Sequence, residues 1–292
     1  MKVLITILSL SVIGAIFGFS MKKDPVEPTS DLPLKLYNDD GDKFIIIGHR
    51  GASAYAPENT MSAFRMAAEM GAEMIELDIV LSKDGVPVVI HDETLDRTTN
   101  AKGLVSDYTL EELKMLDAGS WFSDEFKGEA IPTLEEVLEW AKGRVSVNIE
   151  VKTEAVTDEA EGGIESKALA LVDKFGMREH VIFSSFDYRS ASHIGALAPD
   201  VAKAILYEKS QSKGKSPADL AEEYSIQAFN CSFRELKSGW MSDMLAKEVP
   251  VLIYTVNDKK RMRSLINRGV SGIFSDKPDL LREAVENLWE NN

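Results

Sequence analysis

The chain has 292 residues, of which 44% are hydrophobic and 28% charged, a composition typical of a globular protein and unlike a disordered chain. Its 33 basic residues against 48 acidic ones give a formal net charge of -15, which makes nucleic acid and anionic lipid poor partners. One cysteine, Cys231, excludes an internal disulfide and a cysteine-based zinc site.

The N-terminus has the pattern of a secretory signal. Lys2 precedes an apolar run over residues 3–19, and the small residue Ser20 follows it. We expect residues 1–20 to be a signal peptide and residues 21–42, which are polar and contain proline, to be a flexible leader. The alternative is a retained membrane anchor, because the run approaches the length of a membrane span. The protein is therefore expected in the periplasm or outside the cell, with no stable membrane partner unless this segment is kept.

From residue 44 onward, short apolar runs alternate with amphipathic stretches. Residues 44–47 are aromatic and β-branched, as expected for a strand buried on both faces of a parallel sheet. Residues 60–71 place apolar side chains on one face of a predicted helix, and Gly71 can end it. The second strand is predicted over residues 74–78.

The second strand is predicted to continue into a hairpin. Residues 86–90 follow it too soon for a crossover helix, which needs about a dozen residues. Asp84-Gly85 is instead a hairpin turn signal, so this run returns antiparallel and brings His91 back to the strand ends. The next stretch, residues 93–130, is long for a loop, and we predict a small inserted cap subdomain over one side of the mouth.

The rest of the chain repeats the strand and helix pattern. Thr133 and Glu136 form a capping-box pattern ahead of a predicted helix that Gly143 closes. Eight runs can be parallel strands; they end near His49, Asp78, Glu150, Ser185, Tyr207, Asn230, Val256 and Ser275. Eight strand–helix units in about 250 residues have the size and rhythm of an α/β TIM (β/α)8 barrel. We predict one such domain over residues 43–292.

A histidine and an arginine directly follow the first predicted strand. Residues at this position of a TIM barrel face the active-site mouth. Arg50 offers a planar fork for phosphate or carboxylate, and His49 can move a proton near neutral pH. The pair suits an anionic substrate. The alternative is a capped core histidine beside a surface salt bridge.

Acidic residues gather at the ends of two further strands. Glu76 and Asp78 lie on the same side of one strand because side chains alternate, and two carboxylates in a shared space repel unless a proton or cation lies between them. Glu150 adds a third carboxylate, and Lys152 faces the same way. Oxygen ligands suit a hard divalent cation, calcium or magnesium. The alternative is that these acids face solvent.

Ten short motifs occur in order from Phe44 to about Leu281. They are His49-Arg50-Gly51, Pro57-Glu58-Asn59-Thr60, Glu76-x-Asp78, residues 84–92, Arg97-Thr98-Thr99, Ile131-Pro132-Thr133-Leu134, Glu150-x-Lys152 with Ser185-Phe186, Thr255-Val256-Asn257, and Gly272-Ile273-x-x-Asp276-x-Pro278. This ordered set resembles the glycerophosphodiester phosphodiesterases. Tyr254 is a departure, because the family usually has tryptophan before the Thr-Val-Asn.

The resemblance implies a phosphoric diester hydrolase that converts glycerophosphodiesters to glycerol 3-phosphate and an alcohol. It implies one divalent cation, calcium or magnesium, and a small-molecule substrate as the partner. The implied roles are metal ligands for Glu76, Asp78 and Glu150, an acid–base pair for His49 and His91, and phosphate neutralisation for Arg50 and Lys152. Phe186 and Tyr254 are expected to pack on the leaving alcohol, with core packing as the alternative.

Two other functions fit the same barrel. A phosphodiester lyase similar to the phosphatidylinositol phospholipases C would stop at a cyclic phosphate. A non-catalytic binding barrel would need a broken set of site residues, and here all seven positions with acid, base, metal or phosphate roles carry competent side chains.

Overall fold

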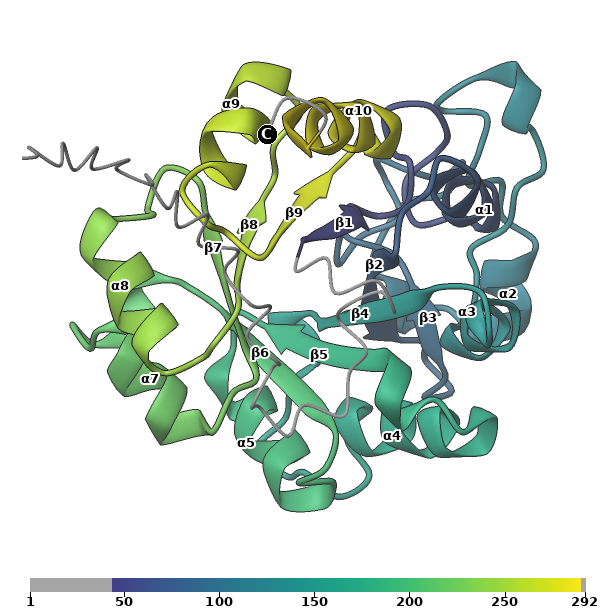
Figure 1. Cartoon of the computed structure of the whole chain (residues 1–292). Helices are drawn as coiled ribbons and strands as arrows, with labels where there is room; N and C mark the ends of the chain where they lie inside the picture. Colours follow the sequence, from purple (N-terminus) through teal and green to yellow (C-terminus); the bar gives the residue numbers. More distant parts are fainter. Residues whose placement is uncertain (1–43, 290–292) are drawn as a thin grey trace, which may run out of the picture.

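The computed structural model describes residues 44–289; the predicted signal peptide (1–20) and the predicted leader (21–42) lie outside the described residues. Eight parallel strands form a closed barrel surrounded by helices (Figure 1). β1 (Ile45–Gly48) pairs with the last strand of the chain and also with β2, which closes the barrel. The predicted TIM barrel is therefore confirmed.

The strands and helices alternate along the chain. The strands after β1 are β2 (Met74–Leu81), β3 (Pro87–Val89), β4 (Ser146–Val151), β5 (Val181–Ser185), β6 (Ala202–Leu206), β7 (Ala228–Ser232), β8 (Val251–Tyr254) and β9 (Gly272–Ser275). The helices are α1 (Met61–Glu69), α2 (Leu110–Lys114), α3 (Leu134–Ala141), α4 (Ile164–Phe175), α5 (Tyr188–Leu197), α6 (Lys209–Ser212), α7 (Pro217–Tyr224), α8 (Ser238–Ala246), α9 (Lys259–Ile266) and α10 (Pro278–Trp289). No helix of residues 44–289 is long and apolar enough to span a membrane.

Side chains of each strand alternate between the barrel interior and the helices outside it. In β2, Ile75 and Leu77 pack among the helices, whereas Met74 joins the interior cluster. The interior cluster consists of Ile45, Ile47, Met74, Ile182, Ala202, Ala204, Ala228, Leu252 and Phe274. Alternation then places Glu76 and Asp78 on the interior side of the barrel, after Met74 of the interior cluster and closer to the carboxyl end of β2.

Side-chain caps fix where the helices begin. Thr60 accepts a hydrogen bond from the backbone nitrogen of Ala63 at the start of α1. Thr133 and Glu136 form the predicted capping box of α3, each bonding the other's backbone nitrogen. Such caps contribute about 1 kcal/mol each to stability.

The predicted hairpin is confirmed. β3 runs antiparallel to β2, with Leu81 opposite Pro87, and the turn passes through Gly85 at a φ of 76°. Residues 93–130 follow it; they contain α2 and two short 3₁₀ turns. Apolar side chains of this segment, among them Leu95 and Leu113, form a separate small cluster with Val80, Val88 and Ile90 of the hairpin.

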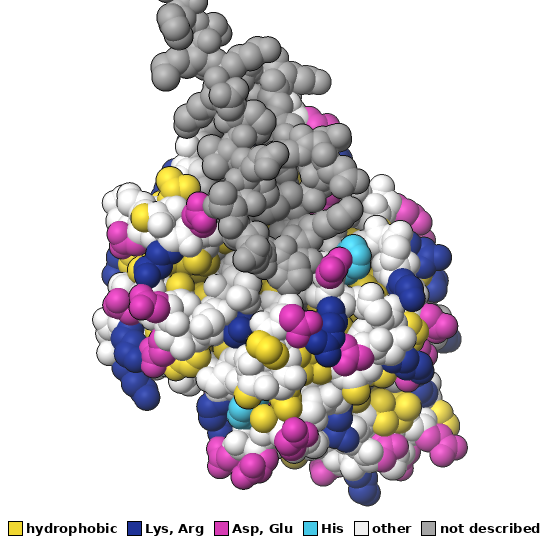
Figure 2. Space-filling model, turned by 60° about the horizontal axis from the view of Figure 1, so that its bottom comes forward, with side chains coloured by type: hydrophobic (Ala, Val, Ile, Leu, Met, Phe, Trp, Pro, Cys, Tyr) yellow, Lys and Arg dark blue, Asp and Glu magenta, His cyan; other side chains and the backbone are white. Residues whose placement is uncertain are grey.

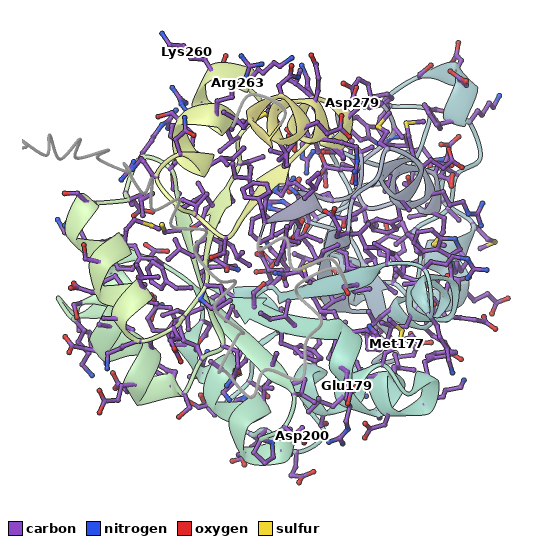
Figure 3. All side chains as sticks on the ribbon, in the orientation of Figure 1. Met177, Glu179, Asp200, Lys260, Arg263 and Asp279 are labelled. Atoms are coloured by element: carbon purple, nitrogen blue, oxygen red, sulfur yellow. The ribbon has the colours of Figure 1, made fainter. Side chains whose placement is uncertain are left out.

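The surface carries both signs of charge. Figure 2 shows acidic and basic side chains interspersed, with hydrophobic ones between them, over the face that it presents. Figure 3 shows side chains filling the barrel centre, while Lys260 and Arg263 of α9 lie on the outer ring of helices. The barrel is thus a packed core with chemistry confined to its rim.

Candidate active site

The carboxyl ends of the strands surround a cavity of about 210 Å³. Its two halves differ in chemistry. The half formed by β1, β2, β4 and the hairpin is charged, with His49, Arg50, Glu76, His91 and Glu150. The opposite half is mostly aromatic and apolar, with Ser184, Phe186, Leu206, Tyr254, Thr255 and Phe274. A ligand here would meet ionic groups on one side and rings on the other.

Three carboxylates form a compact cluster in the charged half. Glu76, Asp78 and Glu150 each offer an oxygen within 4.8 Å of the others. The register of β2 and β4 brings this about, because Asp78 pairs directly with Glu150 and Glu76 lies one interior position behind. Glu76 is only 3% exposed and Asp78 only 1%.

Burial and mutual repulsion leave this cluster unable to ionise fully by itself. Burial and the charges of Asp78 and Glu150 raise the pKa of Glu76 well above its usual range. Burial and Asp78 raise the pKa of Glu150 to about 7. Burial by itself would raise the pKa of Asp78. The positive charges of Lys152 and Arg50 outweigh this effect and lower the pKa of that carboxyl to about 2.

The cluster fits a hard divalent cation. Its donors are all carboxylate oxygens, and the buried Oδ1 of Asp78 accepts no hydrogen bond, although the Lys152 ammonium lies 3.3 Å away. A doubly charged ion would take the place of the protons that Glu76 and Glu150 otherwise keep. These three residues can therefore hold a metal ion.

Two cationic side chains border the cluster. Lys152 Nζ lies 3.0 Å from Glu150 Oε1 and 3.3 Å from Asp78 Oδ1. The backbone nitrogen of Arg50 donates to Glu76 Oε2 at 2.8 Å, and its Nε lies 3.5 Å from Asp78 Oδ2. Both side chains are mostly buried, so their charges act at low dielectric.

The backbone after β1 is unusual. Arg50 has a φ of 54°, in the left-handed region that non-glycine residues rarely adopt. Gly51 follows at 83°, and a Cβ there would lie 2.5 Å from the carbonyl carbon of Ala63. Only glycine fits this close approach to α1. The His-Arg-Gly sequence therefore forms a tight turn that directs Arg50 toward the carboxylates.

His49 is held by a carboxylate from the far end of the chain. Its Nδ1 lies 2.6 Å from Asp276 Oδ1, and Asp276 also accepts from Ser53 Oγ at 3.0 Å and from Asn257. Burial raises the pKa of Asp276, but these hydrogen bonds hold it below its usual range. An ionised carboxylate can only accept, so Nδ1 carries the proton and Nε2 is left for the cavity. Thr255 Oγ1 lies 3.5 Å from that Nε2.

His91 has a similar partner on the other side. Its Nδ1 lies 2.6 Å from Asp92 Oδ1, and Arg97 bonds both oxygens of Asp92. The hydrogen bond from Arg97 holds the pKa of Asp92 well below its usual range. Burial lowers the pKa of His91, which favours the neutral ring. Both imidazoles are thus oriented by ionised carboxylates.

The structure brings the nine residues predicted from the sequence together at one mouth. Seven line the cavity, while Asp78 and Lys152 lie just behind and contact Glu150 or each other. The Phe186 and Tyr254 rings meet edge to face at 6.1 Å between centroids.

Sequence reasoning assigned no role to several polar residues around the histidines. Asp276 and Asn257 hold His49, Asp92 and Arg97 hold His91, and Asn59 Nδ2 donates to Asp78 Oδ2 at 2.8 Å. Each belongs to one of the ordered motifs, so a signal was present. The partner of each residue was not readable, because these bonds depend on how the loops fold, and the bond between Asp276 and His49 joins residues 227 positions apart.

Comparisons with known proteins agree with this geometry. The family model described as Glycerophosphoryl diester phosphodiesterase family matches residues 49–280. A glycerophosphodiester phosphodiesterase from Caldanaerobacter subterraneus subsp. tengcongensis is 42% identical over 241 residues, 82% of this chain and 96% of that protein. The crystal structure of a glycerophosphodiester phosphodiesterase from Agrobacterium tumefaciens is 33% identical with a TM-score of 0.72, covering 82% of this chain and 98% of the other. An Oleispira antarctica phosphodiesterase, solved with its product sn-glycerol-3-phosphate, is 31% identical with a TM-score of 0.71, covering 82% and 96%.

A TIM barrel with clustered carboxylates and two oriented imidazoles at its mouth, matched over most of its length, defines a phosphoric diester hydrolase. The chain belongs to the glycerophosphoryl diester phosphodiesterase family. The resemblance based on the ordered motifs is thereby confirmed.

Proposed function

We propose that the protein is a metal-dependent phosphodiesterase that hydrolyses glycerophosphodiesters to glycerol 3-phosphate and an alcohol. The observation that carries this proposal is that a cluster of three carboxylates and two carboxylate-bonded histidines meet at one cavity, which Glu76, Glu150 and both histidines line. The family match and a related phosphodiesterase solved with sn-glycerol-3-phosphate support the substrate class.

The cation, calcium or magnesium, would be held by Glu76, Asp78 and Glu150. When bound, it supplies positive charge where the phosphate oxygens become more negative during attack. Arg50 and Lys152 add to this stabilisation, since both are mostly buried at the edge of the cluster. The substrate's phosphate is therefore expected against the charged half of the cavity, and its organic group against Phe186 and Tyr254.

Two proton transfers are needed, and the chain supplies one histidine for each. One imidazole takes a proton from the attacking oxygen, and the other gives a proton to the leaving alcohol oxygen as its bond to phosphorus breaks. The attacking oxygen belongs to water or to the neighbouring glycerol hydroxyl, which would form a cyclic phosphate that water then opens. The lowered pKa of His91 suits a base, because the ring is neutral at neutral pH.

The test is a product assay on a panel of glycerophosphodiesters that differ in the alcohol. Divalent cations are removed from the purified protein with a chelator, and calcium or magnesium is then added back. Phosphorus NMR follows the products. We expect glycerol 3-phosphate with a restored rate in at least one metal. Accumulation of a cyclic phosphate alone would identify a lyase. An absence of turnover on the whole panel would contradict the proposal.

A variant of the aromatic half tests where the organic group lies. Phe186→Ala is expected to raise KM about 10-fold, because a lost ring contact removes about 0.5–1.5 kcal/mol beyond the buried area. kcat should change less, since the Phe186 ring carries no group that can transfer a proton or bind the phosphate, and it packs edge to face on Tyr254. Steady-state kinetics on the best diester of the panel measures both constants. An unchanged KM would place the organic group elsewhere.

We also propose that residues 43–292 form one catalytic domain with residues 93–130 as an insertion.

The signal pattern of residues 1–20 leads us to propose that the protein is exported. Cell fractionation tests this export. A mature protein in the periplasm or medium that begins after Ser20 is expected; a cytoplasmic protein that keeps this segment would contradict it.

A further inference from the structure

A continuous set of hydrogen bonds runs outside the carboxylate cluster from Arg50 to His91. Arg50 NH1 donates to Glu58 Oε1 at 2.8 Å. Arg97 donates to Glu58 from NH1 at 2.8 Å and from NH2 at 2.7 Å. The same guanidinium donates to Asp92 from Nε at 2.6 Å and NH2 at 3.0 Å, and Asp92 accepts from His91.

Two inner members of this set, Glu58 and Arg97, lie outside the cavity. Neither Glu58 nor Arg97 lines the 210 Å³ cavity. Glu58 is instead mostly buried, at 13% exposure, beside a separate space of only about 10 Å³ that His91 and Thr98 also line. That space is roughly one water molecule in size, so Glu58 has little room to move inward.

The geometry depends on the shape of the arginine. Arg97 uses one edge of its planar fork for both oxygens of Asp92 and the other edge for both oxygens of Glu58. A lysine ammonium keeps the charge but cannot make this pair of bidentate contacts. Burial raises the pKa of Glu58, but Arg97 and Arg50 outweigh it and lower that pKa, so the carboxylate stays ionised between them.

We propose that Glu58 and Arg97 are positioning residues that hold the phosphate-binding Arg50 and the acid–base histidine His91 in one fixed arrangement. Arg97 acts on His91 through Asp92 and sets the tautomer with the proton on Nδ1. Glu58 accepts hydrogen bonds from both Arg50 and Arg97, so it positions Arg50 directly and His91 through Arg97 and Asp92. The inference rests on the proposed function for its kinetic part, whereas the tautomer of His91 is independent of any activity.

The two residues should affect different kinetic constants. Arg97→Lys is expected to lower kcat about 10–100-fold, the usual effect of losing a group that orients a site residue, with KM changed less than about 3-fold. Arg50 keeps its bonds to Glu58 and Glu76 in that variant. Glu58→Gln should lower kcat and also raise KM, because Arg50 loses a charged partner.

The double variant tests whether the residues form one unit. In Glu58→Gln with Arg97→Lys, the fall in kcat should be clearly smaller than the product of the two single effects, since both changes break the same chain. Multiplicative losses would mean that the two residues act separately and would overturn the proposal.

The chain offers a matched control in Arg178. It is 39% exposed against 43% for Arg97, and it also bridges two carboxylates, Asp173 and Asp200. Asp200 lies at the outer edge of the molecule, far from the barrel centre (Figure 3). Arg178→Lys should leave kcat and KM unchanged within about 2-fold, in line with the small effects of surface substitutions.

Nitrogen NMR of the imidazoles gives a readout that a merely structural role would not move. The parent and Arg178→Lys should show His91 as a single Nδ1–H tautomer, and Arg97→Lys should show a mixture. His91→Gln assigns the signal, and thermal melts confirm that each variant folds. An unchanged tautomer in both Arg97→Lys and Glu58→Gln would overturn the proposal. If the parent proves inactive on every diester, the proposed function fails, but the tautomer result still decides the positioning role.

Discussion

Replacing His49 by glutamine is expected to lower kcat about 10²–10⁴-fold, the usual contribution of a positioned general acid or base. Nδ1 of His49 is committed to Asp276 at 2.6 Å, so only Nε2 is left to exchange a proton with substrate. Glutamine can fill the space and bond Asp276, but it cannot take up or release a proton at neutral pH. KM should change little, because Arg50 and Lys152, the proposed phosphate-binding residues, are unchanged.

His193 is the matched control for this experiment. It too has Nδ1 facing a buried carboxylate, Glu165 Oε1 at 3.4 Å, but it lies on α5 outside the barrel. His193→Gln should retain parental kinetics. Steady-state rates with a saturating divalent cation, and circular dichroism to check folding, decide the matter. Parental kcat in His49→Gln would remove His49 from the chemistry.

The barrel was predictable because its determinants are local. Buried parallel strands appear as short β-branched runs, and the hairpin required only Asp84-Gly85 between two such runs. The carboxylate cluster was predictable for the same reason. Alternation along β2 places Glu76 and Asp78 on one side, and the neighbouring parallel strand adds Glu150 at the same level.

The partners of the histidines were not predictable in this way. Asp276 is 227 residues from His49, and the two meet only because β9 closes the barrel against β1. The contact thus depends on the register of a nonlocal strand pair, and no spacing rule encodes that register. A histidine followed directly by an acid, as in His91-Asp92, is the local case that a sequence can suggest.

The bonds of Glu58 depend on backbone geometry that composition does not reveal. Arg50 and Asn59 both adopt positive φ values, 54° and 57°, and the Asn59 backbone nitrogen donates to the Arg50 carbonyl oxygen at 3.1 Å, which closes the intervening segment into a loop. Asn59 tolerates this conformation better than most residues, whereas an arginine there is uncommon. The surrounding contacts must hold it, and they come from Glu58 and from two carboxylates of β2.

Glu150→Gln is expected to abolish divalent-cation binding and reduce turnover to the level of the chelated parent. The change removes one of three carboxylates whose oxygens lie within 4.8 Å of one another, while keeping its size, and hard divalent cations bind through such charged oxygens. Calcium or magnesium at about 100 times its dissociation constant should stabilise the parent by about 2.7 kcal/mol and leave Glu150→Gln unaffected. For a chain of this size that is a rise in Tm of about 5–10 °C.

The pH dependence of this effect follows from the raised pKa of Glu150, about 7 in the folded protein against 4.5 ordinarily. Between these values the unfolded chain has already released the proton that the folded chain keeps. The metal-free parent should therefore lose stability as pH rises from about 4.5 to about 7. Over the same interval metal affinity should rise, because the ion must displace that proton. Thermal melts with and without the cation from pH 5 to 8 measure both trends, with Glu150→Gln as the control. Equal metal shifts in Tm at pH 5 and pH 8, or an equal shift in the variant, would mean that the cation binds elsewhere.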